Sequence, residues 1–102
     1  MATTHSTDGT WTAPATLGLD TRTDFRNEAM ALLDQLPEGS GRLRIDLTGT
    51  RSVDSAGLGA LMLVQRHAAE RRQGIVLVGP SDELRYLLTL TKLDDLFQIE
   101  LA

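Results

Sequence analysis

The stretch RLRIDLTGTRSVDSAGLGALMLV, residues 42–64, predicts a strand, a short loop and an apolar helix. Its apolar residues first alternate with polar ones, the pattern of a strand with one better buried face: Leu43, Ile45 and Leu47. Residues 49–54 then have the composition of a turn, and the apolar residues after them fall at helical spacing. We therefore predict that Ser55 is the N-cap residue of this helix.

The composition indicates one soluble globular domain. The 102 residues are 41% hydrophobic and 24% charged, enough to bury one core but too few for two domains. Without cysteine, disulfides and thiolate chemistry are excluded. The two histidines, His5 and His67, have no partner at ligand spacing, so we expect no zinc site and no cofactor.

The charge and hydropathy patterns exclude two other classes of partner. A net charge of -4 argues against nucleic acid, which requires a clustered cationic surface. The longest apolar run, residues 58–64, is far shorter than the ~20 residues that span a bilayer. No secretory signal is visible at the N-terminus. We expect a cytoplasmic protein with no membrane insertion.

The N-terminal part predicts little regular structure. Residues 1–9 are polar without periodicity and predict a disordered leader, which leaves residues 10–102 as the domain. The β-formers in residues 10–12 and 15–19 predict a small hairpin, with Pro14 at an edge position.

Two further helices flank the central stretch. The first begins at Asp20 or Thr21 and has an apolar stripe along one face: Phe25, Ala29, Leu32, Leu33 and Leu36. The third is capped by Ser81, with two acidic residues in its first turn and a predicted buried stripe: Leu84, Leu87, Leu88 and Thr91.

Between these helices the pattern predicts a parallel sheet. The central helix is expected to end near Gln73, with Gly74 in the left-handed position that follows a helix. Residues 75–78 form a continuous apolar run, as in a strand covered on both faces, and residues 98–101 offer a last short strand. Alternation of strands and helices indicates an α/β fold with right-handed crossovers.

No enzyme signature survives a geometric test. Ser55 and His67 lie twelve residues apart on one predicted helix, roughly 18 Å along its axis, whereas a Ser–His hydrogen bond spans about 3 Å. The lone glycine pair at Gly57 and Gly59 is not a nucleotide-binding motif, and we interpret it as permitting close approach of another backbone.

Ser55 therefore has two interpretations. As a cap alone it stabilises the helix by about 0.5–2 kcal/mol. As a phosphoacceptor it would place roughly -1.5 to -2 charges beside Asp54, at the positive end of a helix dipole that tolerates them. The fold would survive, and a partner that packs on this surface would be repelled.

The segments Ile45-Asp46-Leu47 and Val53-Asp54-Ser55-Ala56-Gly57-Leu58-Gly59-Ala60-Leu61 resemble the signature of the STAS domain, in particular bacterial anti-sigma factor antagonists. The resemblance continues through residues 75–80 and 93–97. It implies a single STAS domain with a mixed, mostly parallel sheet of four to five strands packed with three to four helices. Lys92 departs from the family pattern, which often has glycine there.

The resemblance implies a function for this surface. In the family, an anti-sigma factor that is also a serine kinase phosphorylates the serine; the unmodified form binds the kinase and releases the sigma factor. Ser55 would be the phosphoacceptor in a non-enzymatic monomer or weak dimer. The residues expected to contact the kinase are Asp20, Asp54, Ala56, Gly57, Leu58 and Leu61. Two alternatives stay open: a STAS subunit that braces the ATPase of a phospholipid-transport ABC complex, and a scaffold component of a stress-signalling assembly.

Overall fold

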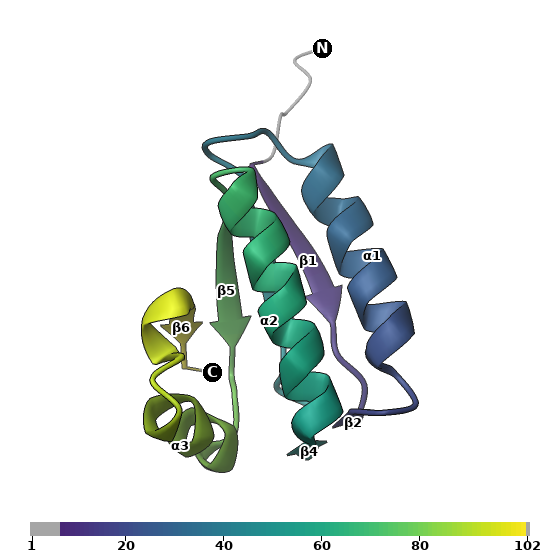
Figure 1. The fold of residues 1–102 in the computed structure, drawn as a ribbon, viewed down its shortest axis with the longest axis vertical. Coiled ribbons are helices and arrows are strands. Elements are labelled where there is room, and N and C mark those ends of the chain that lie inside the picture. The colour runs from purple at the N-terminus through teal and green to yellow at the C-terminus, as the bar shows by residue number, and fades with distance from the viewer. Residues whose placement is uncertain (1–6, 102) are drawn as a thin grey trace.

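The computed structural model describes residues 7–101 as a parallel sheet with two helices over one face (Figure 1). The main sheet has the strand order β1-β3-β5-β6, and all of its pairings are parallel. Its strands are β1 (Asp8–Thr12), β3 (Arg42–Asp46), β5 (Gly74–Val78) and β6 (Gln98–Glu100). Helices α1 (Arg22–Gln35) and α2 (Ser55–Glu70) lie side by side over it. The predicted α/β fold is confirmed.

The core lies between the two helices and the sheet. Leu43 and Ile45 of β3 face the helices and are fully buried, as the period-2 pattern predicts. The helices contribute Phe25, Leu33 and Leu61, none of which is exposed. Because both layers bury their apolar side chains here, α2 is fixed along its length and its start is held at one end of the sheet.

A second sheet, of two short strands, positions the start of α2. Strand β2 (Thr16–Leu17) pairs in parallel with β4 (Ser52–Val53), the strand that runs into α2. The predicted N-terminal hairpin is therefore wrong, because β1 pairs with β3 and β2 with β4 instead of with each other. The segment between β1 and β2 also contacts the segment between β3 and β4, because the Thr50 hydroxyl donates to the Pro14 carbonyl at 2.8 Å.

The domain also begins earlier than the composition indicates. Asp8 and Gly9, assigned to the leader by their polar character, form the first residues of β1 and pair with β3. The ion pair between Arg42 and Asp8 lies on the same two strands, at 3.2 Å. The rest of the predicted leader, residues 1–6, lies outside the described residues.

Helix α2 ends at Glu70, before the predicted end near Gln73. The left-handed residue after it is Arg72, at φ 56°, and Gly74 opens β5 as the partner of Arg42. The predicted role of Gly74 is therefore wrong.

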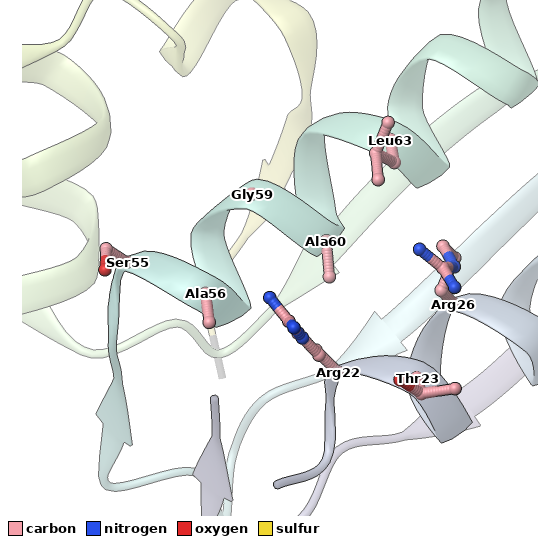
Figure 2. Close-up of a pocket in the computed structure, with 8 residues that line it drawn as sticks. All are labelled: Arg22, Thr23, Arg26, Ser55, Ala56, Gly59, Ala60 and Leu63. Atoms are coloured by element: carbon pink, nitrogen blue, oxygen red, sulfur yellow. The ribbon is translucent and has the colours of Figure 1, made fainter. Parts of the chain in front are cut away.

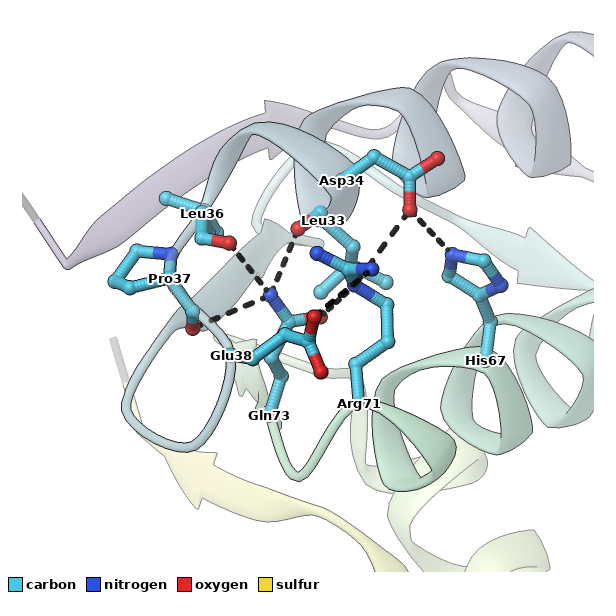
Figure 3. Close-up of polar contacts among 8 residues, drawn as sticks. All are labelled: Leu33, Asp34, Leu36, Pro37, Glu38, His67, Arg71 and Gln73. Atoms are coloured by element: carbon cyan, nitrogen blue, oxygen red, sulfur yellow. Dashed lines mark hydrogen bonds and ion pairs between the residues drawn. The ribbon is translucent and has the colours of Figure 1, made fainter.

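A buried amide shortly after the end of α2 contacts α1, an interaction that a local pattern does not show (Figure 3). Gln73 is 8% exposed, and its side-chain amide donates to the carbonyls of Leu33 at 2.7 Å and Leu36 at 3.0 Å. Beside it, Asp34 of α1 contacts His67 at 2.8 Å and Arg71 at 3.6 Å. These contacts join the ends of α1 and α2 that lie farthest from Ser55.

Helix α3 (Asp82–Leu90) follows β5 and begins as predicted, with the Ser81 hydroxyl accepting from the Leu84 amide at 3.1 Å. Thr91 is exposed as the C-cap residue and does not belong to the buried stripe. Lys92 then adopts φ 61°, the left-handed conformation for which glycine is better suited. The short 3-10 helix η1 (Asp94–Leu96) leads into β6.

Candidate partner-binding site at the start of helix α2

Asp54, and not Ser55, is the N-cap of α2. Its backbone is extended, and its carboxylate accepts a hydrogen bond from the Gly57 amide at 2.9 Å. The same carboxylate accepts from the Leu19 amide at 3.2 Å. The predicted cap at Ser55 is wrong by one residue, because an ionised carboxylate is the stronger acceptor for these amides.

The Asp54 carboxylate also joins α2 to the loop before α1. The Gly57 amide lowers the pKa of Asp54 most, and the Leu19 amide and the Arg22 charge lower it further. Since hydrogen bonds that favour the ionised form lower the pKa of a carboxyl group, Asp54 is a carboxylate at neutral pH. One side chain thus caps the helix and holds a loop more than thirty residues away in sequence.

Two glycines allow this close approach of backbones. A Cβ atom on Gly57 would lie 2.1 Å from the Leu17 carbonyl oxygen, and one on Gly18 would lie 2.3 Å from the Asp54 carboxylate. The expectation that an early glycine of this helix permits close backbone approach is confirmed at Gly57. A Cβ atom on Gly59 would meet no other described residue within 4 Å outside its own helical turn, so that position is open.

Because Asp54 serves as the cap, the Ser55 hydroxyl is left without a structural role. Ser55 is the first residue of α2 and is exposed. Its side chain makes no hydrogen bond with any residue of the described segment 7–101. The first turn of α2 contains no acidic residue, so the negative charge at this helix start comes from the Asp54 cap alone.

The other predicted contact residues divide into surface and interior. Asp20 is exposed and directly follows Leu19, whose amide donates to the Asp54 carboxylate. Ala56 and Leu58 are half-buried. Gly57 and Leu61 are buried, Leu61 fully: a Cβ on Gly57 would meet the Leu17 backbone, and Leu61 lies in the core. Their contact with a partner stays a prediction.

Sequence interpretation missed a groove next to Ser55. It lies between α1 and α2 with a volume of about 380 Å³ (Figure 2). Its lining comes from both helices: Arg22, Thr23, Arg26, Ser55, Ala56, Gly59, Ala60 and Leu63. The spacing of Arg22 and Arg26, one helical turn apart, was the available signal. That spacing indicates a groove only when the helix that faces the two arginines is known.

The predicted separation of Ser55 from His67 is confirmed, since both residues lie on α2 and His67 contacts Asp34 at the far end of that helix.

Within residues 7–101 no three side chains of metal-ligating type gather into a site. In that same part of the chain, no helix has the length and apolar character needed to cross a membrane.

Comparison with known proteins identifies the family. A family model described as "Mlab, STAS domain" matches residues 13–99, and the chain therefore belongs to the STAS domain family. The anti-sigma-B factor antagonists of Listeria monocytogenes and Listeria innocua are each 40% identical to it over 58 residues. That match covers 57% of this chain and 51% of each relative, so it spans about half the length of these proteins.

Solved structures agree on the fold. A crystal structure of a Thermotoga maritima protein, provisionally described as an anti-sigma factor antagonist, superimposes with a TM-score of 0.78 at 20% identity. It covers 94% of this chain and 80% of its own. An NMR structure of the Thermotoga protein gives a TM-score of 0.77, also at 20% identity, over 94% of this chain and 75% of its own. At this identity the likeness shows the fold alone.

Proposed function

We propose that this protein is an anti-sigma factor antagonist that binds an anti-sigma factor serine kinase, releases a sigma factor, and is switched off by phosphorylation of Ser55. The observation that carries the proposal is the exposed Ser55 hydroxyl at the first residue of α2, which makes no hydrogen bond within residues 7–101. The similarity to the two Listeria antagonists supports it.

The site tolerates the added charge. A phosphate on Ser55 would carry roughly -1.5 to -2 charges at pH 7. The equivalent first position of α3 holds an acidic residue, Asp82, followed by Glu83, whereas the first turn of α2 holds none. Helix α3 accommodates two acidic residues in its first turn, and a phosphate on Ser55 would likewise lie at the positive end of the α2 dipole, next to the Asp54 cap, so the fold is expected to persist.

The same added charge would weaken the binding of a partner protein to this surface. Asp54 is already ionised beside Ser55, and the small residues Ala56 and Gly59 leave this part of the helix accessible. A protein packed on this surface would have to desolvate the phosphate next to that carboxylate. Each 1.4 kcal/mol lost weakens binding about tenfold, so a loss of a few kcal/mol would be enough to release the partner.

In this proposal the chain is the substrate of the kinase and has no catalytic role of its own. It acts in the cytoplasm through a protein partner and needs no cofactor.

The test is phosphorylation by the candidate kinase, read by intact mass. The chain is incubated with ATP and the kinase, beside Ser55→Ala and a matched control, Ser40→Ala, which changes an exposed loop serine. One phosphate is expected on the wild type and on Ser40→Ala, and none on Ser55→Ala. Ser55→Asp should lose kinase binding. A phosphate retained by Ser55→Ala would contradict the proposal.

The second candidate is a subunit that braces the ATPase of a phospholipid-transport ABC complex. The observation that favours it is the description of the matching family model, which names Mlab and no antagonist. Co-purification with an ABC ATPase, together with unchanged binding by Ser55→Asp, would favour this candidate. A scaffold role in a stress-signalling assembly would instead give binding to several signalling proteins through the same surface.

A further inference from the structure

The groove between α1 and α2 carries two arginines without an ion-pair partner. Both side chains point across the groove toward α2, whereas the Ser55 hydroxyl at its end points away from them (Figure 2). Neither Arg22 nor Arg26 forms an ion pair or a side-chain hydrogen bond within residues 7–101. The positive charge of Arg22 helps to lower the pKa of Asp54, but the Asp54 carboxylate accepts its hydrogen bonds from the amides of Gly57 and Leu19.

The stability of α1 does not account for these arginines. Arg22 is the first residue of α1, where the helix dipole disfavours a positive charge. Arg26 lies four residues later on the same face, where two like charges repel each other. Among the residues that the structure describes, no carboxylate lines the groove, although the chain as a whole carries a net charge of -4. The groove is therefore a local positive site on an acidic protein.

The opposite wall of the groove suits a peptide backbone. It consists of Ala56, Gly59 and Ala60, whose side chains are small, and of Leu63, which is 43% exposed. Nothing lies within 4 Å of a Cβ placed on Gly59. A chain segment can therefore lie against α2 while its charged groups reach the arginines and an apolar side chain meets Leu63.

We infer that this groove binds an acidic segment of the partner protein, with two carboxylates paired to Arg22 and Arg26. One helical turn separates the two arginines by about 6 Å along α1. Alternate residues of an extended chain are spaced by about 6.6 Å on one side, which matches that separation. Since the partner is the one in the proposed function, the inference rests on that function and extends its docking surface from Ser55 to Leu63.

The test is an NMR titration of the full ¹⁵N-labelled chain at low ionic strength, with the peptide Glu-Ala-Glu-Ala-Glu-Ala as probe. Saturable shifts are expected at the amides of the groove residues. Arg22→Gln/Arg26→Gln should weaken binding by about tenfold or more, because charge-assisted pairs are lost. The control Arg66→Gln/Arg72→Gln removes the same charge from exposed arginines elsewhere and should bind as the wild type does.

Three outcomes would overturn the inference. The first is equal weakening in both double variants, which would indicate net charge alone. The second is binding of the matched Gln-Ala peptide as strongly as the Glu-Ala peptide. The third is inorganic phosphate saturating the same amides at lower concentration than the peptide, which would assign the groove to a small anion. None of these depends on a kinase, so failure of the proposed function is read separately, from the phosphorylation experiment.

Discussion

The starts of α2 and α3 share one capping geometry and differ in everything around it. In both helices a side-chain oxygen of the cap residue accepts from the amide of the third helical residue. Asp54 accepts from Gly57 at 2.9 Å, and Ser81 accepts from Leu84 at 3.1 Å. The backbone is therefore satisfied equally at the two ends.

The residues after the cap show the difference. Helix α3 places Asp82 and Glu83 in its first turn and buries Leu84 in the core. Helix α2 places Ser55 there with no acidic residue, and its third residue, Gly57, lies against a loop backbone. The α3 start has a neutral cap and two acidic residues in its first turn, while the α2 start has a charged cap, Asp54, followed by an exposed hydroxyl.

The largest expected effect comes from the backbone contact that only α2 has. Gly57→Ala would place a Cβ 2.1 Å from the Leu17 carbonyl oxygen and should lower the free energy of unfolding by about 3 kcal/mol. Gly59→Ala, two residues along the same helix, meets nothing and should raise it by up to about 1 kcal/mol. Urea denaturation measures both. Equal effects would show that the loop contact is not what holds α2 in place.

The two caps should also differ in strength. Ser81→Ala removes one hydrogen bond and should cost about 1 kcal/mol. Asp54→Ala removes two, to Gly57 and to Leu19, and should shift the urea midpoint further. A smaller shift for Asp54→Ala than for Ser81→Ala would contradict the dual role of the carboxylate.

Acidification offers an independent test of the same carboxylate. The pKa of Asp54 is lowered in the folded chain, so its ionisation stabilises the fold above the unfolded-state pKa of about 3.9. That stabilisation is lost as the pH falls through the folded pKa. The free energy of unfolding of Asp54→Ala should therefore fall less steeply than that of the wild type under acidic conditions. Parallel pH profiles would contradict the predicted shift.

Exchanging the first residues of the two helices should exchange their electrostatics. Ser55→Asp gives α2 the acidic first position of α3 and should stabilise the chain by about 0.3–1 kcal/mol. The reciprocal Asp82→Ser should destabilise it by a similar amount or slightly more, since Asp82 also lies 3.6 Å from Arg85. Thermal unfolding at low and high salt checks both, because the dipole effect is screened by salt. Destabilisation by Ser55→Asp would mean that the α2 start does not tolerate charge.

The C-terminal ends of α2 and α3, unlike their starts, should respond alike to substitution. Arg72 after α2 and Lys92 after α3 adopt φ 56° and φ 61°. Replacing either by glycine should stabilise the chain by up to about 1 kcal/mol, because glycine enters the left-handed region without steric cost. Similar gains at both positions would place the difference between the helices at their starts. Unequal gains would point to a further constraint at one end.

The sequence predicted the elements whose signal is local. The period-2 pattern of β3, the helical stripe of α1 and the Ser81 cap depend on neighbouring residues, and the structure confirms them. The predictions that were wrong concern contacts between residues that are distant in sequence. The parallel pairing of β2 with β4 requires residues some 36 positions apart, and Gln73, after the end of α2, donates to the carbonyls of Leu33 and Leu36, also some 40 positions away.

The candidate site follows the same division. A local pattern placed Ser55 at a helix start, but it did not show that Asp54 is the cap and also accepts from the Leu19 amide, which belongs to another loop. Periodicity alone also did not show that Gly57 and Leu61 are buried, because the loop that covers Gly57 comes from the β2–α1 connection. The arginine groove exists only once α1 and α2 lie side by side.

The most direct measurement is the stability and amide spectrum of the full chain carrying phosphoserine at position 55, compared with the unmodified chain. The predicted result is an unfolding midpoint equal to or above that of the unmodified chain, with chemical-shift changes confined to the start of α2, the Leu19 loop and the adjoining groove. A lowered midpoint, or shifts spread through the sheet, would contradict the claim that Ser55 accepts charge without disturbing the fold.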